Sequence, residues 1–210
     1  MVQYSEYFLS KQIGPNVIGF SSVEIPDMSG VFSQAEYWVA NYFLSNLTSS
    51  YRMPMHAYCR LFLTRVSFAY EIYDQARLKT IEFVDGGAQS PSTYSAAISR
   101  WEVFLGQTWH ALETLAKAWD GRVHEPKDGS KEFKLHELYN AIKHAEDRIK
   151  EGHLKEDDVS VVWFDGNGLT SRKISMSYQE ASEILYELGV YADALQNPAT
   201  AIKTLEDAGL

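Results

Sequence analysis

The sequence predicts an all-α fold: an antiparallel helical bundle with one β-hairpin inserted before the last long helix. Most of the 210 residues fall in long segments in which apolar side chains recur every three or four positions. One segment, at about 159–176, instead alternates and is rich in β-branched and aromatic residues. Gly, Pro, Ser and Asp residues separate the segments, as turns require.

Residues 1–32 are predicted to form an irregular N-terminal arm that lies over the helical body. Glycine and proline punctuate this stretch every few positions, at Gly14-Pro15, Gly19, Pro26 and Gly30. Residues 33–210 then form the bundle.

The first helix is expected to begin at Ser33, because Ser33 and Glu36 have the spacing of a capping box. Apolar residues from Tyr37 to Leu47 cover most of its circumference, which is typical of a central or interface helix. The second helix, at about 53–83, carries an apolar seam and a neighbouring stripe. The seam comprises Met55, Cys59, Phe62, Val66, Ala69, Tyr73 and Ala76, and the stripe comprises Tyr58, Leu61, Phe68 and Ile72. Together these two helices predict a homodimer.

Two further helices are predicted at about 92–119 and 130–150. Their core stripes comprise Ile98, Trp101, Leu105, Thr108, Leu112, Leu115 and Trp119 in the first, and Leu135, Leu138, Ile142, Ala145 and Ile149 in the second. Asp120-Gly121 ends the first helix and Gly152 the second.

The hairpin is expected to consist of residues 159–164, the turn Asp165-Gly166-Asn167-Gly168 and a return strand through Met176. Ser177 and Glu180 form a second capping box, so the last long helix begins there. Asn197-Pro198 ends that helix, and a short terminal helix or tail follows.

Composition limits the function classes. A net charge of −9, from 19 basic and 28 acidic residues, argues against a broad, non-specific nucleic-acid grip. The single cysteine, Cys59, allows no internal disulfide and favours a reducing compartment. No signal peptide is evident, and no run approaches the about 18 apolar residues of a membrane span. We therefore expect a cytoplasmic protein with no membrane association.

No metal or cofactor is expected. A carboxylate-bridged metal site in a bundle needs Glu-x-x-His motifs, which the sequence lacks; His110 and Glu113 give only the reversed spacing. The turn at Asp165 lacks the side-chain oxygens of a calcium loop. Phosphate-binding Gly-rich loops and Gly-x-Ser-x-Gly elbows are also missing.

The sharpest functional signal is a polar face on the helix at 130–150. Asn140 and His144 are four residues apart and share one side of that helix, with His136 and Lys143 close by. An amide, an imidazole and an ammonium on one face are groups that can hold a phosphate and move a proton.

The segment Tyr139-Asn140-Ala141-Ile142-Lys143-His144, late in a helical bundle, resembles the HEPN superfamily of nucleotide-binding domains. The hallmark of that family is an Arg, usually a polar residue next, and a His four to six residues after the Arg. Asn140 and His144 match, but Tyr139 stands where the Arg is expected. With the hairpin and one more helix, the segment is also similar to prokaryotic proteins of this general kind.

The resemblance implies two functions. Catalytic members cut RNA without metal, using paired motifs across a dimer. In such an enzyme His144 would transfer protons, Asn140 would position it or the phosphate, and Lys143 would supply the charge that Tyr139 cannot. Members without the motif bind or regulate partners. Because the Arg is missing, a non-catalytic module that binds a protein, nucleotide or RNA partner is the first hypothesis, with Tyr139, Lys143 and His136 as binding residues. A toxin-type or phage-defence endoribonuclease is the second.

Two alternatives stay open. Asn140 and His144 could serve structure alone, by hydrogen bonding to the backbone of the arm or the hairpin. A small-molecule enzyme with a pocket in the bundle is the other, although nothing in the sequence specifies its substrate.

Overall fold

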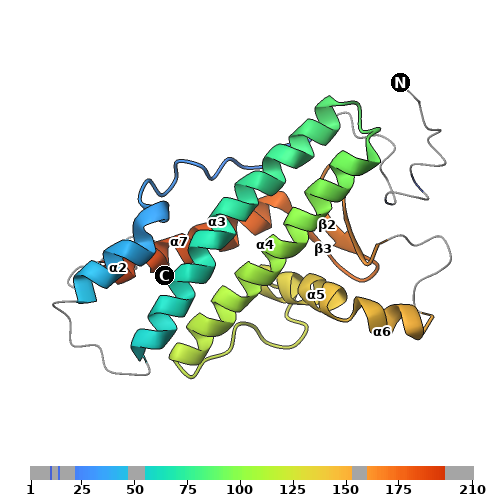
Figure 1. Ribbon diagram of the computed structural model, residues 1–210. Helices are drawn as coiled ribbons and strands as arrows, with labels where there is room; N and C mark the ends of the chain where they lie inside the picture. The colour runs from blue at the N-terminus through green and yellow to red at the C-terminus, as the bar shows by residue number, and fades with distance from the viewer. Residues whose placement is uncertain (1–9, 11–13, 15–21, 47–54, 153–159, 197–210) are drawn as a thin grey trace.

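The computed structural model shows a mostly helical protein with a small antiparallel sheet (Figure 1). It describes residues 10, 14, 22–46, 55–152 and 160–196. Two long helices, α3 (Met55–Asp85) and α4 (Pro91–Ala118), lie side by side and run antiparallel, and α7 (Tyr178–Gln196) packs against both. This confirms a mostly helical architecture in which a strand segment precedes the last long helix.

The apolar seam of the second predicted helix forms the centre of the core. From Cys59 to Ala76 every seam residue of α3 is buried, as the spacing predicted. The neighbouring stripe is divided: Ile72 is buried, whereas Leu61 is 45% and Phe68 39% exposed. One face of α3 therefore carries apolar side chains at the protein surface.

A capped start and an internal hydrogen bond fix α4 against α3. The Ser90 hydroxyl accepts a hydrogen bond from the Thr93 amide at 3.3 Å, and Pro91 occupies the first turn, where no amide donor is needed. Deeper in the core, the Trp101 indole donates to the Thr80 hydroxyl at 2.9 Å. The buried N–H donor of Trp101 thus has a hydrogen-bond partner within the protein.

The predicted start of the first helix is wrong. Residues Ala35–Tyr37 form a short 3-10 turn (η1), and α2 follows at Trp38–Asn46. Gln34 is the residue before the turn, and no side chain caps it, so the Ser33 and Glu36 capping box does not form. Apolar residues do occur on most sides of this helix, as expected, but only one side is buried: Trp38 is buried and Leu44 is 66% exposed.

The predicted helix at 130–150 is also divided. It consists of α5 (Lys131–Lys143) and α6 (Ala145–Lys150), with a break at His144. Ser130 caps α5 by accepting from the Phe133 amide at 3.1 Å. The break places His144 between the two helices, outside the helix that carries Asn140.

The single predicted hairpin is a three-stranded meander. Strand β1 (Val162–Phe164) pairs with β2 (Gly168–Ser171), and β2 pairs with β3 (Ser175–Ser177), both antiparallel. The long return strand is therefore interrupted by a second turn at 172–174, where Arg172 and Lys173 are exposed. Gly168 is required in β2, because a Cβ there would lie 2.1 Å from the Met176 carbonyl oxygen.

The second capping box is confirmed. The Glu180 amide donates to the Ser177 hydroxyl at 3.1 Å, and the Ser177 amide donates to the Glu180 carboxylate at 2.9 Å. Lys134 of α5 also pairs with Glu180. Burial would raise the pKa of Glu180, but the hydrogen bonds from Lys134 and Ser177 outweigh it and lower that pKa.

Part of the predicted organisation lies outside the described residues. This applies to most of the N-terminal arm, to Val159 and to the terminal helix or tail beyond 196. Within the arm, residues 22–28 have neither helix nor strand, and a turn follows at 29–31. No helix of the described ranges is both long and apolar enough to cross a membrane.

Candidate functional site

Four of the five predicted site residues line one side of α5, facing α4 and the loop between these helices. His136, Tyr139 and Asn140 are half-buried, and Lys143 is exposed at the end of the helix. The opposite side of α5, with Leu135, Leu138 and Ala141, is buried in the core. The helix thus places its polar side chains outward by the same period that buries its apolar ones.

A linear chain of hydrogen bonds joins Asn140 to two imidazoles. The Asn140 Nδ2 lies 2.9 Å from His136 Nε2, and His136 Nδ1 lies 2.9 Å from His124 Nε2. The far nitrogen of His124, Nδ1, lies 2.9 Å from the Glu125 carbonyl oxygen. We call Asn140, His136 and His124 the imidazole chain.

The carbonyl at one end fixes the tautomers. Because the Glu125 carbonyl oxygen can only accept, His124 Nδ1 carries a hydrogen and its Nε2 accepts. His136 must then donate from Nδ1 and accept the Asn140 amide hydrogen at Nε2. Every member is satisfied with both rings neutral. A single added proton would require the Asn140 amide to turn its oxygen toward His136, and two would place N–H groups against each other.

Trp109 of α4 packs against the imidazole chain. Its indole is 7% exposed and stacks on the His136 ring, with centroids 4.1 Å apart and planes 11° apart. The stack holds His136 in one orientation. Burial, and then the charge of His124, lower the pKa of His136 below its usual value.

A second, shorter relay runs beside the first. The Tyr139 hydroxyl lies 3.3 Å from His110 Nε2, and His110 Nδ1 lies 3.3 Å from the Glu113 carboxylate. Because a carboxylate only accepts, His110 Nδ1 donates to Glu113; in the neutral ring Nε2 then accepts from the Tyr139 hydroxyl. The Lys143 ammonium lies 5.9 Å from the centre of the Tyr139 ring, within cation–π range.

The fifth predicted residue, His144, lies apart from these contacts. It is the residue between α5 and α6, its side chain is 53% exposed, and its Nδ1 lies 3.6 Å from the Asp147 carboxylate. The predicted Asn140 and His144 pair shares a backbone hydrogen bond, but the two side chains turn to different partners. Within the described residues, neither side chain bonds to the backbone of the arm or the sheet; most of the arm lies outside those residues, so the structural alternative stays open.

A shallow groove of about 230 Å³ adjoins the imidazole chain, and we call it the loop groove. His124 and the edge of Trp109 line it, together with Glu113, Lys117 and Arg122. Lys117 lies 3.8 Å from Glu113, and both are at least a third exposed. A series of contacts thus runs from Lys117 through Glu113, His110 and Tyr139 to Lys143. We call the surface formed by these side chains and the imidazole chain the α4–α5 face.

Sequence reasoning missed Trp109, His110 and His124 as partners of the α5 residues. His124 stands in a polar loop twelve positions before His136, where no helical period relates the two. The available signal was the concentration of histidine in 122–155, which holds four of the six in the chain. Nothing in the sequence marked Trp109, because its spacing suits a core position equally well.

In the part of the chain that the structure describes, no group of three or more His, Cys, Asp or Glu side chains is placed to hold a metal ion. No protein-family model matches the chain, and no curated protein or solved structure matches it at a significant level. The HEPN resemblance therefore stays a prediction, and function is inferred from the geometry of the face.

Proposed function

We propose that this chain is a non-catalytic, HEPN-like interaction or regulatory module that binds a nucleotide or a single-stranded RNA through the α4–α5 face. The observation that carries the proposal is a connected surface of three braced imidazoles, rimmed by exposed cations, in an acidic protein. His110, His124 and His136 lie on one connected surface, in a chain with net charge −9.

Exposed cations at the rim suit a phosphate group. Lys117 is 64% and Arg122 76% exposed, and among the described residues the ion-pair partner of each is a surface carboxylate, 3.8 and 3.5 Å away. Such surface ion pairs contribute little and can be exchanged for a phosphate. The imidazoles of His110, His124 and His136 have both ring nitrogens engaged within the protein, so they brace the surface that carries these cations.

The non-catalytic assignment rests on how the imidazoles are used. His136 has both ring nitrogens engaged and is stacked on Trp109, so it holds the face together and has no nitrogen left for a substrate. Tyr139, at the position of the family's Arg, is hydrogen-bonded to His110. A phenol cannot form the bidentate, charged contact that an Arg makes with a phosphate.

The test is fluorescence anisotropy of the full chain with a labelled single-stranded RNA and with a labelled nucleotide. We expect affinity to fall steeply with salt. The double variant Lys117→Gln, Lys143→Gln should weaken binding about tenfold, whereas the control Lys150→Gln on α6 should not. The RNA should stay intact in the presence of chelator. An unchanged affinity in the double variant, or no binding at low salt, overturns the proposal.

A metal-independent endoribonuclease is the second candidate, and a specific feature favours it. His144 is exposed, stands outside the imidazole chain, and has a carboxylate, Asp147, 3.6 Å from Nδ1. A carboxylate beside Nδ1 can orient the ring and leaves Nε2 available for proton transfer. In this candidate the two His144 side chains of a homodimer share one cleft, and exposed Leu61 and Phe68 offer apolar surface for a second copy.

RNA cleavage with chelator present separates the two candidates. Cleavage that disappears in His144→Ala and persists in His136→Gln establishes the ribonuclease. Intact RNA at high protein concentration, with binding retained, supports the module. Sedimentation equilibrium of the same samples tests the dimer, since a monomer at every concentration removes the shared cleft.

A further inference from the structure

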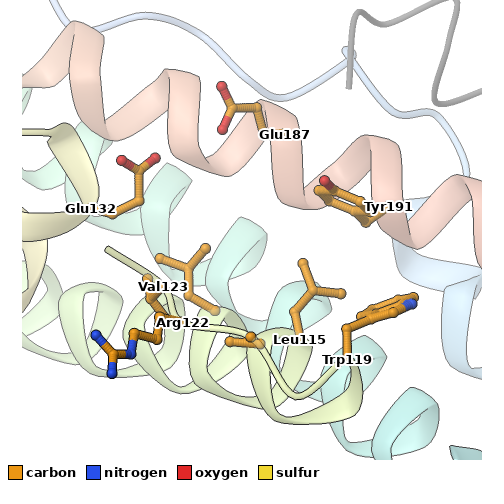
Figure 2. A pocket seen from close by; sticks show the side chains of 10 residues that line it. Leu115, Trp119, Arg122, Val123, Glu132, Glu187 and Tyr191 are labelled. Carbon is orange, nitrogen blue, oxygen red and sulfur yellow. The ribbon is translucent and has the colours of Figure 1, made fainter. Parts of the chain in front are cut away.

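A second groove, of about 530 Å³, opens beside the loop that follows α4 (Figure 2). We call it the acidic groove. The side chains that matter for its chemistry come from α4, the loop, α5 and α7; they are Leu115, Trp119, Val123, Glu132, Glu187 and Tyr191. Its volume lies within the range of small-molecule pockets.

Aromatic and aliphatic groups form one end of the groove. The rings of Trp119 and Tyr191 lie at this end, Leu115 and Val123 lie between them and Glu132, and Glu187 projects from α7 on the opposite side (Figure 2). The Trp119 side chain belongs to a residue that is 60% exposed, although an indole of this size is usually covered in a folded protein. A ligand with an apolar body would cover this ring.

Carboxylates lie at the other end and along the α7 side of the groove. Glu132 comes from the first turn of α5 and Glu187 from the middle of α7. Among the described residues Glu132 makes no ion pair. Glu187 lies 2.5 Å from the Lys131 ammonium, but that single ammonium also serves Glu183 at 3.8 Å. Negative charge therefore remains in excess here.

The one cation in the lining does not neutralise this end. Arg122 is 76% exposed, pairs with Glu125 at 3.5 Å, and turns its guanidinium away from the other labelled side chains (Figure 2). Burial, and then the charge of Glu187, raise the pKa of Tyr191, as expected for a phenol beside an acidic end.

We propose that the acidic groove binds a small organic cation with an apolar body, of the alkylammonium or arylammonium class. The ammonium group would be held by Glu132 and Glu187, and the apolar body would lie on Leu115 and Val123 against the two rings. An anion of the same shape would meet two carboxylates and be repelled.

Three ligands with the same phenylpropyl body test the proposal by isothermal titration of the full chain. Phenylpropylammonium should bind at least about tenfold more tightly than phenylpropanol, and phenylpropanoate should not bind measurably. Added salt should reduce the difference between the cation and the alcohol. Equal affinity for all three ligands, or no saturable binding of the ammonium, overturns the proposal.

Variants locate the site. Glu132→Gln removes one carboxylate without disturbing an ion pair, and should weaken ammonium binding roughly three- to tenfold while leaving the alcohol unchanged. Glu146→Gln, on exposed α6, is the matched control and should bind as the original chain does. Trp119→Ala should weaken the cation and the alcohol alike. Ammonium binding that is indifferent to Glu132→Gln and to Trp119→Ala contradicts the proposed site.

Discussion

Replacing His136 by Ala tests the imidazole chain most directly. The change removes two hydrogen bonds of 2.9 Å and the stack on Trp109. Each such hydrogen bond contributes about 1 kcal/mol, and an aromatic stack about 0.5–1.5 kcal/mol. Because the side chain is half-exposed and water can replace part of this, we expect a loss of about 2 kcal/mol in the free energy of unfolding at neutral pH.

Urea denaturation, followed by far-ultraviolet circular dichroism, measures this loss. For a chain of this length the same change lowers the thermal midpoint by about 4–8 °C. His144→Ala is the matched control: its side chain is 53% exposed and caps no helix, so its effect should stay within about 0.5 kcal/mol. Equal effects of the two substitutions would refute the assignment of a structural role to the imidazole chain.

The cost of His136→Ala should also depend on pH. The pKa of His136 is lowered on folding from its usual 6.5, so the unfolded chain binds this proton more readily than the folded chain. The stabilising contacts are therefore fully present above pH 6.5 and are lost as pH falls through the lower folded value. Of the charged groups around the ring, His124 and Lys143 lower its pKa, while Glu113 and Glu137 raise it.

We expect the stability difference between the original chain and His136→Ala to be largest near pH 8 and to shrink toward about pH 5. Denaturation in urea at several pH values measures it, with His144→Ala again as the control. A difference that is constant over this range, or that grows in acid, would contradict a neutral His136 in the imidazole chain.

Three further substitutions test the fold around the site. Gly168→Ala should destabilise the sheet by roughly 3 kcal/mol or more, since its Cβ would lie 2.1 Å from the Met176 carbonyl oxygen; chemical denaturation measures the loss. Thr80→Val should cost about 1–3 kcal/mol in the same assay, because the buried Trp101 indole loses its acceptor; an unchanged midpoint would contradict that hydrogen bond. Ser130→Ala should cost about 1 kcal/mol and speed hydrogen exchange in the first turn of α5, and normal protection there would exclude a capping role.

The sequence predicted the elements whose periodicity is long and regular. The seam of α3 shows this, because seven apolar residues at alternating steps of four and three define one face with little ambiguity. The Ser177 and Glu180 capping box was also predictable, since both hydrogen bonds are local. The same spacing at Ser33 and Glu36 predicted a helix start that the structure does not have. There α2 begins at Trp38, which is buried together with Tyr42.

The candidate site was predictable only in part. The period of α5 placed His136, Tyr139 and Asn140 together, and the structure describes them on one side of that helix. Their partners could not be found in this way, since Trp109 and His124 come from another helix and from an irregular loop. Nor did the pattern reveal the break at His144, because Ala145 and Ile149 continue the apolar spacing on chemistry alone.

The two proposed sites carry opposite charge and are only one helical turn apart on α5. Glu132 faces the acidic groove, while His136, four residues later, belongs to the imidazole chain. If general surface charge governed binding, any loss of a nearby charge would alter RNA and ammonium affinities together. If the two sites are separate, Glu132→Gln should lower the affinity for the ammonium alone. The Lys117→Gln, Lys143→Gln double variant should lower the affinity for RNA alone. Both titrations on both variants, at one ionic strength, distinguish local recognition from a general electrostatic effect.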